Sequence, residues 1–111
     1  MIFVPQQDEL DEATAAATAS DFQCLCVLMP VYNEVRTVAT IVQRVLDAPR
    51  TELDLELVIV DDGSTDGSWA VIEKLAAADP RIIAIQHPHN RGKGAAIRTA
   101  IAASRGDIAL I

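Results

Sequence analysis

The residues best suited to chemistry lie in one acidic turn, V-D-D-G-S-T-D-G-S, residues 60–68. From Asp62 the chain reads D-x-S-x-D-G and then, after five further residues, reaches Glu73. This spacing is close to the calcium-loop pattern D-x-[DN]-x-[DN]-G-x5-E. A calcium loop must be entered from a helix, whereas the turn follows L-E-L-V-I-V, a sequence typical of a strand. The context therefore favours an acidic turn at the end of a strand over a calcium site.

The two adjacent carboxylates of this turn must act separately. Successive strand residues point to opposite faces, so Asp61 and Asp62 cannot both reach one ligand from the same side. One can accept the N–H groups of a nucleobase or the hydroxyls of a ribose, while the other holds the following turn. Gly63 permits the chain reversal, and Thr65 or Asp66 is expected to cap the next helix. We therefore expect at least one of the two carboxylates to bind a ligand.

A second candidate site is the glycine-rich basic segment N-R-G-K-G-A-A-I-R, residues 90–98. It lacks the third glycine of a dinucleotide-binding turn, because Ile97 stands at that position. What it supports is a helix N-terminus with accessible backbone and with Arg91, Lys93 and Arg98 nearby, which suits a diphosphate. A helix that begins at a glycine and carries solvated basic side chains fits the sequence equally well.

Two cysteines and two histidines could be combined into a zinc site. Cys24 and Cys26 lie on the same side of the apolar run C-L-C-V-L-M, and His87 and His89 follow a later run. Structural zinc sites usually draw their cysteines from a turn, not from an apolar strand. The pattern therefore favours buried thiols in a reducing compartment, and no metal-binding residue is assigned.

Four apolar runs must position these residues. They are rich in β-branched residues and largely continuous, as expected of strands buried on both faces. The runs cover residues 24–29, 55–60, 81–86 and 107–111.

Three helical patterns separate the runs. The first repeats valine and isoleucine from Val35 to Val45, with Asn33 as its N-cap and Pro49 at its end. The second extends from about Gly67 to Ala78. The third follows Gly94 and is expected to turn Ile97, Ala100 and Ile101 toward the sheet.

The resulting order, β-α-β-α-β-α-β, predicts an α/β fold. Right-handed crossovers give a Rossmann-like parallel sheet with helices on both faces. Ligands of such sheets lie beyond the carboxyl ends of the strands. The polar segments P-V-Y-N-E, D-D-G-S-T-D-G and H-P-H-N-R-G-K-G follow the first three strands, so they should share one rim.

Together, L-M-P-V-Y-N-E, V-I-V-D-D-G-S-T-D-G-S, H-N-R-G-K-G-A-A-I-R-T-A-I and G-D-I-A-L-I resemble glycosyltransferase family 2. The greatest similarity is to transferases of dolichyl or polyprenyl phosphate. It covers about residues 24–111, with four motifs in the family's order and at suitable spacing. The resemblance implies the nucleotide-binding N-terminal half of a GT-A fold.

The resemblance also implies a nucleotide-sugar site drawn from three loops. Its members would be Pro30, Tyr32, Glu34, Val60, Asp61, Asp62, Gly92, Lys93 and Gly94. Val60 and Asp62 would meet the base and the ribose, and Tyr32 would offer an aromatic surface. Two members have neutral alternatives: Pro30 can simply end its strand, and Glu34 suits the first turn of a helix.

Family members carry a D-x-D element after the fourth strand, which holds Mg²⁺ or Mn²⁺ against the sugar diphosphate. This sequence ends at Ile111, before that element, and Asp107 lies at the wrong end of the strand to replace it. The catalytic base and the acceptor site are also downstream in the family. We therefore expect Mg²⁺ or Mn²⁺ in the complete enzyme only, none held tightly by these residues, no catalytic residue among them and no appreciable transferase activity.

The net charge of −7 is concentrated near the N-terminus. Residues 1–22 contain five acidic residues and no basic one, which leaves eleven acidic and nine basic residues in the remainder. Residues 1–22 are accordingly expected to form a flexible acidic tail, and residues 23–111 one domain that is incomplete at its C-terminal end. A basic face for nucleic acid is not expected. The sequence has neither a secretory signal nor a membrane-length apolar run, which predicts a cytoplasmic location, at the membrane face in a full-length protein.

Two classes of function fit these features. The first is the donor half of an inverting glycosyltransferase, which takes a UDP- or GDP-linked sugar and serves a lipid phosphate acceptor. The alternative is a non-catalytic nucleotide-binding or interaction module, for which the fourth apolar run would favour self-association. The sugar, the base and the acceptor are left open.

Overall fold

A computed structural model of the protein describes residues 24–48, 54–105 and 108–110. Its elements are β1 (Cys24–Val31), α2 (Val38–Asp47), β2 (Asp54–Asp61), α3 (Ser68–Ala78), β3 (Ile82–Gln86), α4 (Lys93–Ala103) and β4 (Ile108–Leu110). The alternation predicted from the apolar runs is confirmed. The predicted acidic tail, residues 1–22, and the predicted helix end at Pro49 lie outside the described residues.

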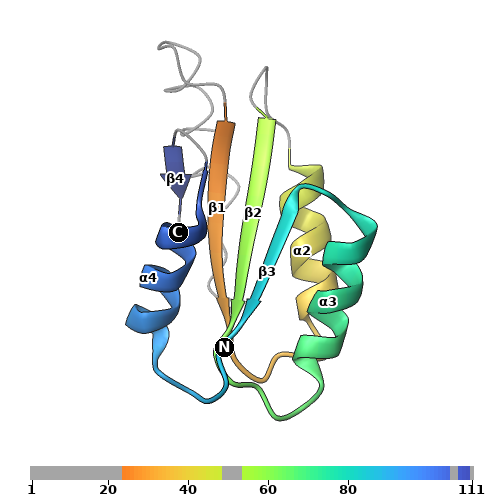
Figure 1. Cartoon of the computed structure of the whole chain (residues 1–111). Coiled ribbons are helices and arrows are strands. Elements are labelled where there is room, and N and C mark those ends of the chain that lie inside the picture. Colours follow the sequence, from red (N-terminus) through yellow and green to blue (C-terminus); the bar gives the residue numbers. More distant parts are fainter. Residues whose placement is uncertain (1–23, 49–53, 106–107, 111) are drawn as a thin grey trace.

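The strands form one parallel sheet in the order β3-β2-β1-β4. β1 pairs with β2 along its full length, from Cys24 opposite Asp54 to Val31 opposite Asp61. β4 pairs with β1 only over Leu25–Val27. Because all pairs are parallel, the carboxyl ends of β1, β2 and β3 meet at one edge, the lower edge in Figure 1. This edge is where a ligand is expected.

Helices cover both faces of the sheet, as predicted (Figure 1). On the face of α2 and α3, the larger core cluster includes Val27, Met29, Leu57 and Ile59. On the face of α4, the smaller cluster contains Cys26, Leu28, Val58, Val60, Ala96 and Ala100. Odd-numbered residues of β1 and β2 therefore face α2 and α3, and even-numbered residues face α4.

β1 continues two residues past its predicted end and includes Pro30. Val31 directs its carbonyl toward β2, where it accepts the N–H of Asp62 at 2.8 Å. Since backbone groups alternate in direction along a strand, residue 30 is directed toward β4, whose described pairing reaches only Val27. The N–H that proline lacks therefore removes no ladder bond with β2, and proline does not end the strand.

The first helix begins later than the sequence predicts. α2 starts at Val38 with Thr37 as its N-cap residue, so the prediction of Asn33 as N-cap is wrong. Asn33 instead has φ of 53°, a left-handed conformation that asparagine tolerates better than most residues. Its side chain binds another loop, as described below, and this tertiary contact displaces the local capping role.

α4 rests on the sheet through alanines. Ala95, Ala96 and Ala100 are buried, whereas Ile101 is 53% exposed and Ile97 is half-buried. The inward orientation predicted from the sequence is confirmed for Ala100 and wrong for Ile101. With about 100° per residue, the helix cannot turn both the alanine stripe and Ile101 toward the same sheet. None of the described helices is long and apolar enough to cross a membrane.

The opposite edge of the sheet contains a buried carboxylate that the apolar pattern of β2 did not predict. Glu56 is 8% exposed, and its Oε1 accepts the N–H of Arg105 at 2.7 Å and the thiol of Cys26 at 3.4 Å. The guanidinium Nε of Arg105 lies 3.5 Å from Oε2. Glu56 thus links Arg105, in the segment after α4, to the central strands.

This environment predicts a difference in reactivity between the two thiols. Burial, assisted by Glu56, raises the pKa of Cys26 to about 11, against a lowering contact from Ser104. Cys24 is half-buried at the start of β1. Because the thiolate is the reactive form, an alkylating agent should modify Cys24 well before Cys26 in the native protein. Peptide mapping by mass spectrometry measures both rates.

Single-cysteine variants control this prediction. Cys26→Ala should retain the fast native reaction, Cys24→Ala should retain only the slow one, and both variants should react alike once unfolded in denaturant. Equal native rates in the two variants would contradict the assigned environments.

Candidate functional site

Three loops meet at the carboxyl edge of the sheet, and hydrogen bonds join the first to the second. The N–H of Asn33, in the loop after β1, donates to the hydroxyl oxygen of Ser64 at 2.8 Å. In return, the N–H of Thr65 donates to the side-chain oxygen of Asn33 at 2.8 Å. Two polar segments that the sequence predicts at a common rim are therefore in direct contact.

A second set of bonds closes the same junction around Asp66. Its Oδ2 accepts the N–H of Val35 at 3.1 Å, and its Oδ1 accepts the N–H and the hydroxyl of Ser68 at 3.0 and 2.6 Å. The Ser68 hydroxyl oxygen accepts the N–H of Glu34 at 2.9 Å. These bonds, chiefly the one from the Ser68 hydroxyl, lower the pKa of Asp66. The N-cap position itself belongs to Gly67, with φ of 94°, so the prediction of Thr65 or Asp66 as cap residue is wrong, although Asp66 does accept a first-turn N–H.

The acidic pair is divided between the two faces of the sheet, as predicted. By the alternation of β2, Asp61 points toward α2 and α3, and Asp62 points toward α4. Asp61 is fully buried; its Oδ2 accepts the N–H of Ser64 at 3.3 Å, and its Oδ1 has no hydrogen-bond partner among the described residues.

Asp62 connects β2 to the third loop. Its Oδ1 accepts the ring Nδ1–H of His87 at 2.8 Å and the N–H of Arg91 at 2.9 Å, and its Oδ2 accepts the N–H of Gly92 at 2.9 Å. Burial raises the pKa of Asp62, but these bonds outweigh it and leave the pKa below its ordinary value. In the structure each carboxylate of the pair thus holds a turn. Ligand binding by either one stays a prediction.

The third loop also touches the acidic turn directly at Gly63. Gly63 has φ of 77°, which confirms the chain reversal expected there. A Cβ atom at this position would lie 2.4 Å from the backbone N of Asn90 and 2.4 Å from the carbonyl carbon of His89. The three loops therefore form one continuous rim. The acidic turn and the third loop can approach this closely only because Gly63 has no side chain.

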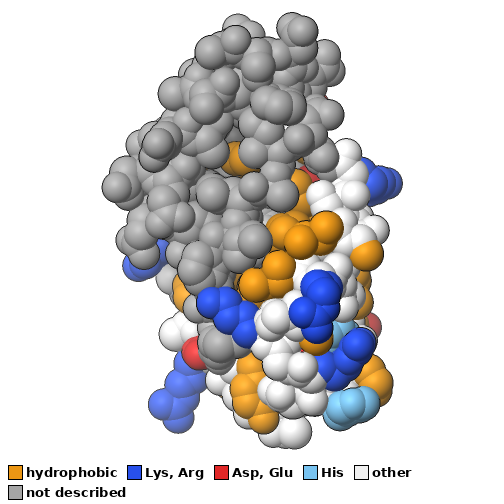
Figure 2. All heavy atoms as spheres, turned by 90° about the vertical axis from the view of Figure 1, so that its left-hand side faces the viewer, with side chains coloured by type: hydrophobic (Ala, Val, Ile, Leu, Met, Phe, Trp, Pro, Cys, Tyr) orange, Lys and Arg blue, Asp and Glu red, His pale blue; other side chains and the backbone are white. Residues whose placement is uncertain are grey.

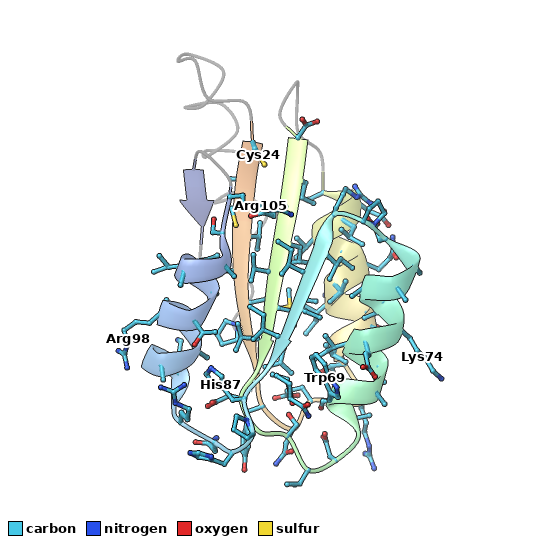
Figure 3. All side chains as sticks on the ribbon, viewed as in Figure 1. Cys24, Trp69, Lys74, His87, Arg98 and Arg105 are labelled. Carbon is cyan, nitrogen blue, oxygen red and sulfur yellow. The ribbon has the colours of Figure 1, made fainter. Side chains whose placement is uncertain are left out.

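His87 is the site residue that the sequence analysis missed in this role. It is 4% exposed and lies between the sheet and α4, where its Nε2 is 2.8 Å from the hydroxyl of Thr99 (Figure 3). The strand register gives the only signal for it: Asp61 pairs with Gln86, so the next residue of each strand, Asp62 and His87, lie side by side. Figure 3 also places His87 and Cys24 at opposite ends of the sheet, which separates the components of the zinc alternative.

The predicted site residues differ in accessibility. Pro30, Val60, Asp61 and Asp62 are buried, Tyr32, Glu34 and Gly92 are half-buried, and Lys93 and Gly94 are exposed. The side chain of Val60 packs in the core under α4, so it offers no surface to a ligand. Arg91, Lys93 and Arg98 are exposed together around the start of α4, and Figure 2 shows lysine and arginine side chains distributed over this face.

The acidic side chains of the turn bind different loops. β2 leads directly into the turn, and Asp62 and Asp66 bind different loops, so their oxygens do not converge on a common point. Across the part of the chain that the structure describes, no three histidine, cysteine or acidic side chains are grouped so as to hold a metal ion. The element before the turn is thus the strand that the sequence predicted, and not the helix that a calcium loop requires.

One open pocket lies away from the rim. Its volume is about 390 Å³, and Cys24, Glu56, Arg81 and Arg105 are among its lining residues, at the amino ends of the strands. It contains no residue of the three loops. Among its charged lining residues, Arg105 is paired with Glu56, and Arg81 is paired with Asp79 outside the pocket.

Known proteins resemble both the sequence and the fold. Glycosyltransferase AglD of Haloferax volcanii is 33% identical over 96 residues, which are 84% of this chain and 15% of that protein. Polyprenol monophosphomannose synthase of Mycolicibacterium smegmatis is 37% identical over 95 residues, 84% of this chain and 34% of that protein. An undecaprenyl-phosphate 4-deoxy-4-formamido-L-arabinose transferase of Pseudomonas fluorescens is 33% identical over 78% of this chain and 26% of that protein. The chain thus spans about a third or less of these relatives.

A solved structure and a family model agree with these relatives. Mannosyltransferase PcManGT from Pyrobaculum calidifontis, in complex with GDP-Man and Mn²⁺, superimposes with a TM-score of 0.63 at 23% identity, over 93% of this chain and 33% of that chain. This likeness shows the fold, the GT-A fold expected from the sequence. The model of the family described as "Glycosyl transferase family 2" matches residues 26–111, which include all three loops of the rim, β1 from Cys26 onward and the whole of β2, β3 and β4. The chain therefore belongs to glycosyltransferase family 2.

Proposed function

We propose that these residues form the donor-nucleotide-binding part of an inverting glycosyltransferase that moves a sugar from a nucleotide diphosphate to a polyprenyl or dolichyl phosphate. Two of the relatives are named for lipid-phosphate or polyprenol substrates, and the similar mannosyltransferase structure contains GDP-Man. These names support the class of donor and acceptor, with UDP and GDP both retained as donor nucleotides.

The observation that carries the proposal is the joined rim at the carboxyl edge. Asp62 binds the N–H groups of Arg91 and Gly92 immediately before α4, so the helix N-terminus is held against the acidic turn. The positive end of the helix dipole and the exposed basic side chains around Lys93 favour a diphosphate there. Tyr32, half-buried at the end of β1, provides an aromatic surface for the base.

The metal is proposed for the complete enzyme alone. Mg²⁺ or Mn²⁺ there would neutralise the diphosphate leaving group. The described residues do not fit such an ion, because Asp62 and Asp66 of the acidic turn are bound to separate loops. What the present residues contribute is binding and orientation of the nucleotide, and we propose that they do not transfer a sugar on their own.

Titration of the 111-residue protein with GDP and with UDP, followed by NMR amide shifts, tests this proposal. We expect weak binding, shifts concentrated at Tyr32, Lys93 and Gly94, and little change when Mn²⁺ is added. Lys93→Ala should weaken binding by about 3- to 10-fold, as loss of a charge-assisted phosphate contact predicts.

Lys74→Ala is the matched control, since Lys74 is exposed on α3, away from the rim, and its loss changes the net charge equally (Figure 3). Equal weakening in the two variants, or shifts spread outside the rim, would contradict the assigned site. Strong metal-dependent affinity would contradict the proposed absence of ion ligands.

A further inference from the structure

We propose that His87 is a positioning residue: it donates from both ring nitrogens, orienting Asp62 so that this carboxylate fixes the loop before α4. The nucleotide part of this inference rests on the proposed function. The loop geometry itself does not, because every contact involved lies within the protein.

The hydrogen-bond donors and acceptors around His87 assign the protonation state of its ring. The Thr99 hydroxyl lies 3.0 Å from the carbonyl of Ala95 and donates its single proton there. Its oxygen is then an acceptor for the Nε2–H of His87 at 2.8 Å. Asp62 is ionised and can only accept, so Nδ1 also carries a proton. His87 is therefore an imidazolium, paired with a carboxylate that is 1% exposed.

The cluster connects three elements in a closed circuit. Asp62 follows β2, His87 follows β3, and Thr99 lies on α4. His87 links Asp62 after β2 to Thr99 on α4. Asp62 also accepts the N–H groups of Arg91 and Gly92, at 2.9 Å each, and so binds the loop that leads into α4.

Gly92, with φ of 95°, is the last residue before α4, so its bond to Asp62 sets where the helix N-terminus begins. If the Nδ1 donor is removed, Asp62 loses the contact that fixes its rotamer. The amide bonds of the loop then loosen, although no residue of the loop has changed.

Two conservative substitutions separate positioning from general stability. The amide nitrogen of asparagine can occupy the place of Nδ1, so His87→Asn keeps a donor for Asp62 and loses the contact with Thr99. The amide nitrogen of glutamine reaches the place of Nε2, so His87→Gln keeps the contact with Thr99 and loses the donor for Asp62. Each variant removes one ring, one charge and one hydrogen bond.

The first measurement needs no ligand: hydrogen exchange of the Arg91 and Gly92 amides by NMR. Both should exchange slowly in the wild type and in His87→Asn. In His87→Gln they should exchange at least about tenfold faster, the effect of losing one hydrogen bond to a charged group. Amides in the middle of β2 report global stability and correct for it. Equal exchange in the two variants after this correction would overturn the proposal.

The second measurement is GDP affinity. It should stay within about threefold of wild type in His87→Asn and fall by about tenfold in His87→Gln. If the wild type binds neither GDP nor UDP, the proposed function fails, and the amide measurement still decides the role of His87. If His87→Gln does not fold, the ring ¹⁵N spectrum of the wild type decides instead: two protonated nitrogens support the proposal, and one bare nitrogen overturns it.

Discussion

Gly63→Ala is expected to destabilise the protein by about 2–5 kcal/mol, a large part of the 5–15 kcal/mol that folded domains typically have. The left-handed φ of 77° contributes about 1–2 kcal/mol of this, because a Cβ atom crowds the following carbonyl. The remainder comes from overlap: the new methyl group would lie 2.4 Å from backbone atoms of His89 and Asn90. Backbone atoms cannot move aside like the end of a flexible side chain, so the acidic turn and the third loop must separate.

Gly67 and Gly92 provide controls. Both have a positive φ, as Gly63 does, but an added Cβ atom would not overlap backbone atoms there. Gly67 has φ of 94°, and a Cβ there would meet only a Val35 methyl group at 3.7 Å, an ordinary contact. Gly92 has φ of 95° and nothing within 4 Å of a built Cβ. Alanine at Gly67, which is in the left-handed region, should therefore cost about 1–2 kcal/mol. Gly92 has ψ of 158°, a region that almost only glycine adopts, so alanine there should cost about 1–3 kcal/mol.

Urea unfolding of the three variants measures the differences, and the denaturant slope m should stay constant. A loss for Gly63→Ala no greater than for the two controls would show that the loops do not pack as closely as the structure places them. NMR shifts in His89 and Asn90 report the separation directly in any folded fraction of Gly63→Ala.

The architecture follows from short-range pattern. Runs such as L-E-L-V-I-V are apolar and β-branched, they alternate with helical periodicities, and crossover handedness then leaves one parallel arrangement. The common rim follows from that arrangement without further information. The same alternation rule correctly placed Asp61 and Asp62 on opposite faces of the sheet.

The partners across the rim do not follow from local pattern. Asn33 looks like a helix cap because its own neighbourhood is helical, yet its side chain binds Thr65, 32 residues away. Asp62 and His87 are 25 residues apart and meet only because β2 and β3 have one particular register. Each of these contacts depends on the register of two neighbouring strands, and hydrophobic periodicity does not predict that register.

The misplaced Ile101 has a different cause. The predicted inner face of the third helix was Ile97, Ala100 and Ile101, whereas Ala96 and Ala100 pack against the sheet. Small side chains allow the helix axis to lie closer to the strands, and the isoleucines then lie on other sides of the helix. Residue size alone therefore misleads where packing is tight.

Asp62→Asn is expected to destabilise the protein by about 3–5 kcal/mol, the usual effect of breaking a buried ion pair. The neutral amide leaves the imidazolium that we propose for His87 without its counter-charge, and its NH₂ group opposes one of the donors that Asp62 accepts. Asp61→Asn is the matched control, since it makes the same chemical change one residue away. Asparagine there keeps an acceptor for the Ser64 N–H, so the expected loss is only about 1 kcal/mol.

The pH dependence of this difference tests its electrostatic origin. The hydrogen bonds keep the folded-state pKa of Asp62 below 3.8, its ordinary value, despite burial. A carboxyl with a lowered folded pKa stabilises the protein above its unfolded pKa, and this stabilisation is lost as the pH falls through the folded value. The gap in unfolding free energy between wild type and Asp62→Asn should therefore narrow below about pH 4. Asp66, whose pKa is also lowered, is present in both proteins and cancels in the comparison. A gap that persists unchanged into acid, or an equal loss for Asp61→Asn, would mean that the Asp62 charge does not hold the rim together.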